Sequence, residues 1–126
     1  MKQFTSWLGL LAFSFFLVSC EYNNEEELYG DKQDCDTSNV AYSQTVKPIL
    51  TASCYSCHSV SNANTFGSGI NLETYSELMI QINNGKLVGA ISHSPGFTPM
   101  PQVGAKLDDC SIEKIKAWIN EGAADN

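Results

Sequence analysis

The five residues Cys54-Tyr55-Ser56-Cys57-His58 constrain this chain more than any other stretch. Positions i and i+3 of a helical turn lie on one face, so both thiols can reach the same edge of a planar ligand. The spacing C-x-x-C-H is the signature of covalent c-type haem attachment, and His58 is then the expected axial ligand of the iron. Zinc is the alternative, but it needs reduced thiolates and a fourth ligand.

The N-terminal segment predicts export. A basic residue, Lys2, precedes an apolar stretch from Phe4 to Val18, which is short for a membrane span. The sequence Leu17-Val18-Ser19-Cys20 resembles the lipobox of bacterial lipoproteins. This resemblance implies that residues 1–19 are removed and that Cys20 carries acyl chains, which anchor the protein to a bacterial membrane facing the periplasm or the cell surface. A plain signal peptide and an uncleaved anchor are the alternatives.

The charge of the chain restricts its partners. The sequence has 14 acidic and 7 basic residues and a net charge of −7. Such a surface disfavours nucleic acid and favours basic partner proteins through long-range attraction. Residues 20–39 include Glu25-Glu26-Glu27 and few large apolar side chains, so we expect an acidic flexible tether there, followed by a folded domain over residues 40–126.

Five cysteines can all be assigned. Cys20 is the predicted lipidation site, and Cys54 and Cys57 are the predicted sites of haem attachment. Cys35 and Cys110 remain. In an oxidising compartment we expect them to form a disulfide, and the zinc alternative is weaker there because it needs reduced thiolates.

Hydrophobic periodicity predicts an all-α domain with three to four short helices. The first helix is expected to start at Thr45 as N-cap and to run into the C-x-x-C-H motif, with Pro48 in its first turn. A loop rich in Ser, Asn and Gly should cover Ser59 to Gly69, where Gly67 and Gly69 would let the backbone approach a ligand. Residues 87–91 could form a short helical piece.

Two further helices have apolar stripes. The earlier one should begin with a capping box made by Thr74 and Glu77 and stop at Asn84-Gly85, whereas the last should be capped by Ser111 and end at Gly122. Their stripes consist of Tyr75, Leu78, Met79 and Ile82, and of Ile112, Ile115, Trp118 and Ile119. Met79 and Trp118 are therefore expected in the core, Trp118 also near the haem.

Met100 is the candidate for the second axial ligand. It lies between Pro99 and Pro101 in an irregular segment, where the two prolines restrict its backbone before folding. A Met/His ligand pair raises the reduction potential of haem, as an electron carrier requires. His93 precedes Met100 by seven residues, and it is the alternative distal ligand, as is an open site.

The order of these features resembles the small monohaem class I cytochromes c over about residues 40 to 123. The resemblance implies one haem c, thioether links at Cys54 and Cys57, His58 as the proximal and Met100 as the distal ligand, and crossed first and last helices. One departure is that Ser59-Val60 follows the histidine where many members have Gly-Pro, whose carbonyl orients the imidazole. The partner of the far nitrogen of His58 is thus not indicated.

Electron transfer is the function that these features favour. With two protein ligands on the iron, such a protein carries single electrons between a membrane-associated donor and a periplasmic or extracellular acceptor rather than catalysing a reaction. A haem enzyme or small-gas-binding protein with an open or displaceable distal site is the first alternative. A structural or sensory lipoprotein that uses haem or zinc only to complete its fold is the second.

Overall fold

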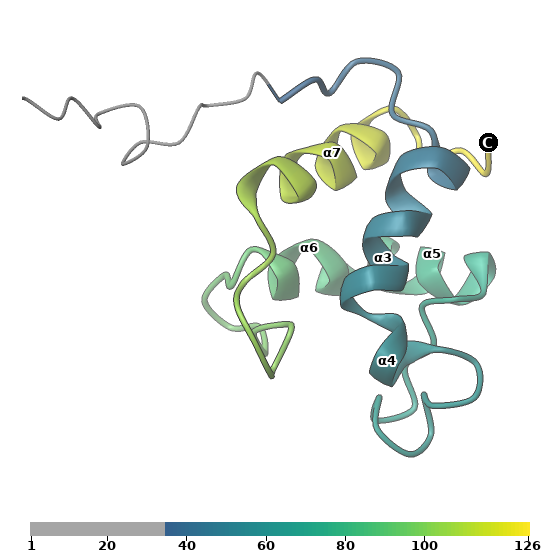
Figure 1. Cartoon of the computed structure of the whole chain (residues 1–126), viewed down its shortest axis with the longest axis vertical. Coiled ribbons are helices and arrows are strands. Elements are labelled where there is room, and N and C mark those ends of the chain that lie inside the picture. Colours follow the sequence, from purple (N-terminus) through teal and green to yellow (C-terminus); the bar gives the residue numbers. More distant parts are fainter. Residues whose placement is uncertain (1–34) are drawn as a thin grey trace, which may run out of the picture. The chain divides into compact units, whose positions relative to one another are not determined.

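The structure, a computed structural model, describes residues 35–126. The expected signal sequence, Cys20 and most of the expected tether lie outside these residues. The described part contains a short π-helix and five α-helices, with no strand, so the prediction of an all-α fold is confirmed (Figure 1). The elements are η1 (Tyr42–Val46), α3 (Lys47–Ser53), α4 (Tyr55–His58), α5 (Tyr75–Asn83), α6 (Lys86–Ile91) and α7 (Asp109–Asn120).

The first helix begins three residues earlier than Thr45, so the prediction of Thr45 as N-cap was wrong. Tyr42 starts η1, and the backbone N–H of Val46 donates to the carbonyl of Ala41 over 3.3 Å. The first two amides of η1 both donate to Asn126, far along the chain. Tyr42 N–H donates to the Asn126 side-chain oxygen over 2.8 Å, and Ser43 N–H donates to the Asn126 backbone oxygen over 2.7 Å. A remote residue thus satisfies donors that local sequence leaves open.

Pro48 lies in the first turn of α3, but η1 precedes it, so it is not in the first turn of the whole helical segment as predicted. A proline has no N–H to donate, and the i→i+5 pattern of η1 changes to the ordinary helical pattern just before it. The helix is then interrupted at Cys54, whose φ of −124° separates α3 from α4.

Thr74 is the N-cap of α5, but the capping box does not form. The Thr74 hydroxyl accepts a hydrogen bond from the Asn71 side-chain amide over 2.9 Å instead of bonding to the helix. The Asn71 oxygen accepts in turn from the N–H groups of Glu73 and Thr74, at 2.9 and 3.3 Å. Asn71 therefore organises this turn. Gly85, with a φ of +73°, separates α5 from α6.

The last helix is capped by Asp108 and not by Ser111, which corrects the prediction. The Asp108 carboxylate accepts from the backbone N–H of Ser111 over 2.8 Å, so Ser111 lies in the first turn of α7. Hydrogen bonding from the Ser111 side chain, together with this bond from its backbone N–H, holds the pKa of Asp108 below its usual value. Asp and Ser are similarly favoured at the N-cap, so residue type alone does not distinguish the two positions.

One apolar core joins the helices. Its completely buried side chains come from η1, α3, α5 and α7: Val46, Leu50, Leu78, Ile115 and Trp118. The predicted stripes of α5 and α7 pack in this core, and Met79 is partly buried against it. Trp118 stacks on Tyr42 with 5.3 Å between ring centroids and donates from its indole N–H to the carbonyl of Ala124. Element η1 also packs against α7.

The compact unit begins at Cys35, within the segment that the sequence assigns to a tether. The Sγ atoms of Cys35 and Cys110 lie at bonding distance, 2.07 Å, so this segment is attached to the first turn of α7. None of the helices in residues 35–126 has the length and apolar character needed to cross a membrane.

The cap of α7 gives a prediction for stability. Replacing Asp108 with Ala should lower the free energy of unfolding by about 1 kcal/mol at pH 7, because the N–H of Ser111 loses its acceptor. The Asp108 pKa is lowered in the folded state, so its contribution is present above the ordinary value of 3.8 and is lost as pH falls through the lowered one. Urea unfolding of both proteins between pH 2 and 7 measures this difference.

Asp109→Ala is the matched control. Its carboxylate pairs with Lys106 over 3.2 Å but is 92% exposed, so we expect a smaller change. A constant difference between wild type and Asp108→Ala across the pH range would contradict the assignment of the cap.

Candidate cofactor site

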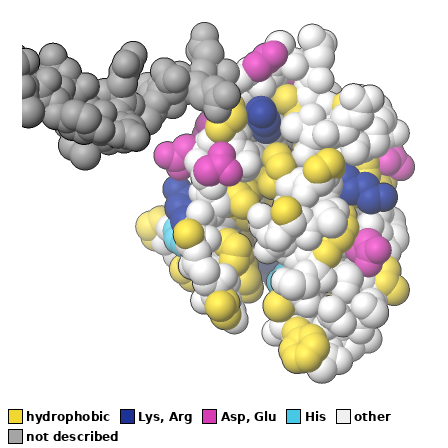
Figure 2. Space-filling view, viewed as in Figure 1, with side chains coloured by type: hydrophobic (Ala, Val, Ile, Leu, Met, Phe, Trp, Pro, Cys, Tyr) yellow, Lys and Arg dark blue, Asp and Glu magenta, His cyan; other side chains and the backbone are white. Residues whose placement is uncertain are grey.

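A cavity of about 520 Å³ lies between the α3–α4 segment on one side and α6 with the loop that follows it on the other. Figure 2 shows this hollow at the lower side of the molecule, with hydrophobic side chains along both walls. Cofactor sites in proteins commonly have volumes of about 300–1,000 Å³ and mainly apolar walls. The predicted residues Cys54, Cys57, His58 and Met100 all line this one cavity, and His93 does not.

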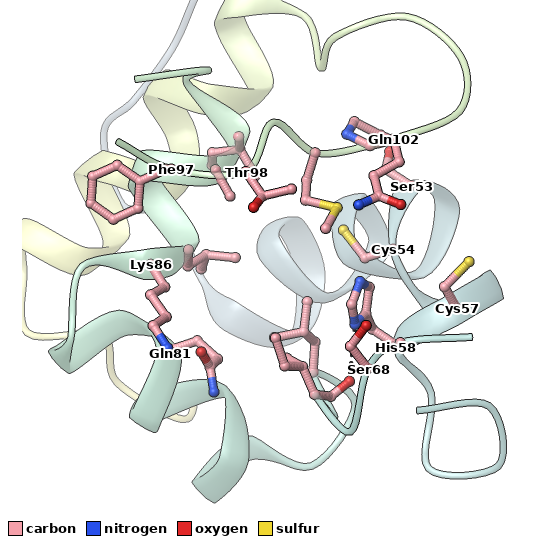
Figure 3. Close-up of a pocket in the computed structure, with 18 of the residues that line it drawn as sticks. Ser53, Cys54, Cys57, His58, Ser68, Gln81, Lys86, Phe97, Thr98 and Gln102 are labelled. Atoms are coloured by element: carbon pink, nitrogen blue, oxygen red, sulfur yellow. Dashed lines mark hydrogen bonds between the residues drawn. The ribbon is translucent and has the colours of Figure 1, made fainter. Parts of the chain in front are cut away.

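The two thiols differ in their surroundings. Cys54 lies in the break between α3 and α4 and is partly buried, whereas Cys57 is exposed. In Figure 3 the Cys54 side chain lies beside His58 at the cavity, and Cys57 lies further out with its sulfur turned away. Burial raises the pKa of the Cys54 thiol to about 11, so this group is neutral at physiological pH.

The turn of α4 is fixed by backbone hydrogen bonds. The N–H groups of Cys57 and His58 both donate to the carbonyl of Cys54, over 3.1 and 2.9 Å. The N–H of Cys54 donates to Leu50 of α3 over 2.8 Å. Both cysteines and the histidine are thus attached to the end of α3, whose Leu50 is in the core.

The ring of His58 is oriented by a backbone carbonyl. Its Nδ1 lies 2.9 Å from the carbonyl oxygen of Ile70, which can only accept, so Nδ1 carries the proton. In the neutral ring Nε2 then holds the free electron pair. The His58 carbonyl accepts from the N–H of Leu72 over 2.8 Å, so the segment after the motif returns to it at two points. Ile70 is the partner that the sequence did not indicate.

Gly67 permits this return. A Cβ at this position would lie 2.6 Å from the Cys57 carbonyl and 2.9 Å from Nδ1 of His58. The sequence predicted a close backbone approach at Gly67 and Gly69, but the two glycines differ. At Gly69 no atom lies within 4 Å of such a Cβ, and the residue is needed for its φ of +79°.

Met100 lines the cavity from the loop that follows α6. Its N–H donates to the carbonyl of Ala90 over 3.1 Å. His93 Nε2 lies 3.1 Å from the Met100 carbonyl. The structure therefore brings Met100 to the cavity and places His93 against the Met100 backbone.

Trp118 is buried in the core, as predicted, but it is not one of the side chains that line the cavity. The expectation that it lies beside the cofactor is therefore not supported by its position.

The charge of the cavity differs from that of the chain. Its described lining includes one lysine, Lys86, and no Asp or Glu. Figure 3 shows Lys86 near Gln81, across the cavity from Cys54 and His58. Sequence reasoning missed both residues, because nothing in their local pattern distinguishes them from other helix-surface side chains.

A zinc site was the alternative to haem attachment for the C-x-x-C-H motif. Among residues 35–126, no three side chains of His, Cys, Asp or Glu are gathered where they could together hold a metal ion.

Gly67→Ala tests how the His58 ring is held. Because the added Cβ would overlap two groups of the motif, we expect the free energy of unfolding to fall by about 1–3 kcal/mol. We also expect the imidazole N–H signal of His58, protected by its bond to Ile70, to weaken or disappear in proton NMR. Gly69→Ala is the control: its strained φ should reduce stability but leave that signal in place, and equal signals in both variants would contradict this role of Gly67.

Comparison of the chain with protein-family models, with curated proteins and with solved structures gives no significant match. Its function is therefore inferred from the residues of the cavity.

Proposed function

We propose that this protein is a membrane-anchored monohaem c-type cytochrome that carries single electrons between a membrane-associated donor and a periplasmic or extracellular acceptor. One observation carries the proposal: residues of the C-x-x-C-H motif and Met100, far apart in sequence, line the same cavity. On this proposal the all-α domain has the cytochrome c fold, in which the packing of η1 against α7 corresponds to the contact of first and last helices.

The residues present fit a haem group. The cavity is of cofactor size, and its two thiols have the spacing that attachment to a porphyrin requires. His58 is held as the tautomer with a free Nε2, which is the state that a metal ligand needs. Thioether formation at Cys57 requires its side chain to turn toward the cavity from the position in Figure 3.

Each residue then has a definite role. Cys54 and Cys57 would hold the haem covalently, and His58 and Met100 would be its axial ligands. When bound, haem c supplies a one-electron couple, whose potential a Met/His pair raises. Ile70 orients the His58 ring through its carbonyl. Buried Leu72, Leu87 and Ile91 line the cavity and would exclude water from the group.

The partners follow from charge and from the expected anchor. Acylation of Cys20, which lies outside the described residues, would keep the domain at a bacterial membrane and limit its search for a partner. The acidic chain favours basic redox proteins and disfavours nucleic acid. At the cavity itself, however, the described lining includes Lys86 and no Asp or Glu, so attraction of basic partners by acidic side chains acts outside the cavity mouth.

Covalent attachment is the first test. The full chain, produced with a cytochrome c maturation system, should keep haem peroxidase stain on a denaturing gel, and the double variant Cys54→Ser/Cys57→Ser should lose it. Cys35→Ser/Cys110→Ser removes two other cysteines, away from the cavity, and should keep the stain. Wild-type protein that contains zinc and no covalent haem would overturn the proposal in favour of a structural or sensory lipoprotein.

Met100→Ala separates an electron carrier from a haem protein with an open distal site. The ferric wild type should show the weak long-wavelength sulfur-to-iron band, and its ferrous form should bind carbon monoxide slowly, because the thioether occupies the sixth position. The variant should lose the band and bind carbon monoxide rapidly. Met79→Leu, in the core, should behave as wild type.

Absence of the band in wild type would refute Met100 ligation. Rapid carbon monoxide binding by the wild type would favour the enzyme or gas-binding alternative.

A further inference from the structure

Both ends of the loop between α6 and Met100 donate a hydrogen bond to the same backbone carbonyl. The oxygen of Ala90 accepts from the N–H of His93 at the start of the loop, over 3.2 Å, and from the N–H of Met100 at its end, over 3.1 Å. Ser94 N–H donates to the carbonyl of Gly89 over 2.9 Å. Both ends of the loop are thus held at the last turn of α6.

The His93 side chain adds a hydrogen bond between the two ends of the loop. His93 has a φ of +54°, in the left-handed region, and its Nε2 lies 3.1 Å from the carbonyl oxygen of Met100. A carbonyl only accepts, so His93 must donate from Nε2, which the neutral Nε2–H tautomer and the imidazolium can both do. The two backbone polar groups of Met100 are therefore both bonded, its N–H to Ala90 and its carbonyl to His93.

We infer, on the basis of the function proposed above, that His93 is a positioning residue that holds the Met100 backbone in place and thereby slows opening of the distal side of the cavity. From the sequence alone, His93 and Met100 are alternative distal ligands. On this inference His93 instead supports Met100 through a hydrogen bond. His93 is not among the side chains that line the cavity, and its Nε2 is engaged by a carbonyl. Met100 does line it.

Besides these backbone bonds, the loop has an attachment through a side chain that His93 variants would keep. A Cβ on Gly89 would overlap the ring of Phe97, so this ring packs directly on the backbone of α6. Phe97 also lines the cavity. Removing the imidazole should consequently leave the loop in place most of the time and raise the population of the open form.

The test compares three variants of the haem-loaded full chain: His93→Ala, His93→Gln and Ser94→Ala. Stopped-flow binding of imidazole to the ferric protein reports opening, since imidazole needs the position that Met100 leaves. His93→Ala should bind imidazole about fivefold faster than wild type, the factor that corresponds to one net hydrogen bond of about 1 kcal/mol. It should also show a weaker sulfur-to-iron band.

His93→Gln keeps an amide donor of similar reach and should restore most of the wild-type rate. Ser94→Ala changes a loop side chain for which no hydrogen bond is present, keeps the backbone bonds and should behave as wild type. Equal rates in wild type and His93→Ala would overturn the inference, as would equal acceleration in His93→Gln.

The outcomes also separate this inference from the proposed function. Haem stain with no sulfur-to-iron band in wild type would overturn the role of His93 but leave covalent haem attachment standing. Loss of haem stain in wild type would overturn both.

Discussion

The apolar contacts among η1, α3, α5 and α7 hold the two walls of the cavity in place. Val46, Leu50 and Ile115 are among the side chains completely buried there, and each such burial contributes about 1.5–3 kcal/mol. The α4 turn is attached to the end of α3, and α6 packs against α5 and α7. Three members of the core, Leu72, Leu87 and Ile91, also line the cavity. Core and cavity are therefore continuous, and a planar apolar cofactor would extend the core.

The wall that carries His58 is held by short backbone contacts. The segment that follows α4 has no regular helix until α5, yet the Ile70 carbonyl and the Leu72 N–H both bond to His58. Gly67 is buried against the motif because it lacks a Cβ. These contacts fix the ring and its tautomer through protein groups alone, which would reduce the ordering cost of binding the proposed cofactor.

The wall that carries Met100 is held differently. Its loop returns to α6 through the carbonyls of Gly89 and Ala90 and through the packing of Phe97 on Gly89. Most of its residues, from Pro95 to Pro99, are exposed. One wall is thus built from contacts within a compact segment and the other from a surface loop with few attachments. On the function proposed above, ligand exchange would therefore occur on the Met100 side.

The sequence alone determined where α5 and α7 lie and the identity of the candidate ligands. Apolar stripes with helical spacing placed α5 and α7 correctly, and Asn84-Gly85 ended α5, because these signals act within a few residues. The signals for the candidate ligands also lie within a few residues: the spacing of Cys54, Cys57 and His58, and the prolines on either side of Met100. Tertiary structure decided what those residues bond to: Asn126 in place of a cap at Thr45, Ile70 as the partner of His58, and the Met100 carbonyl as the partner of His93. Such hydrogen bonds depend on where the chain returns in space, and no local pattern of residue types specifies that return.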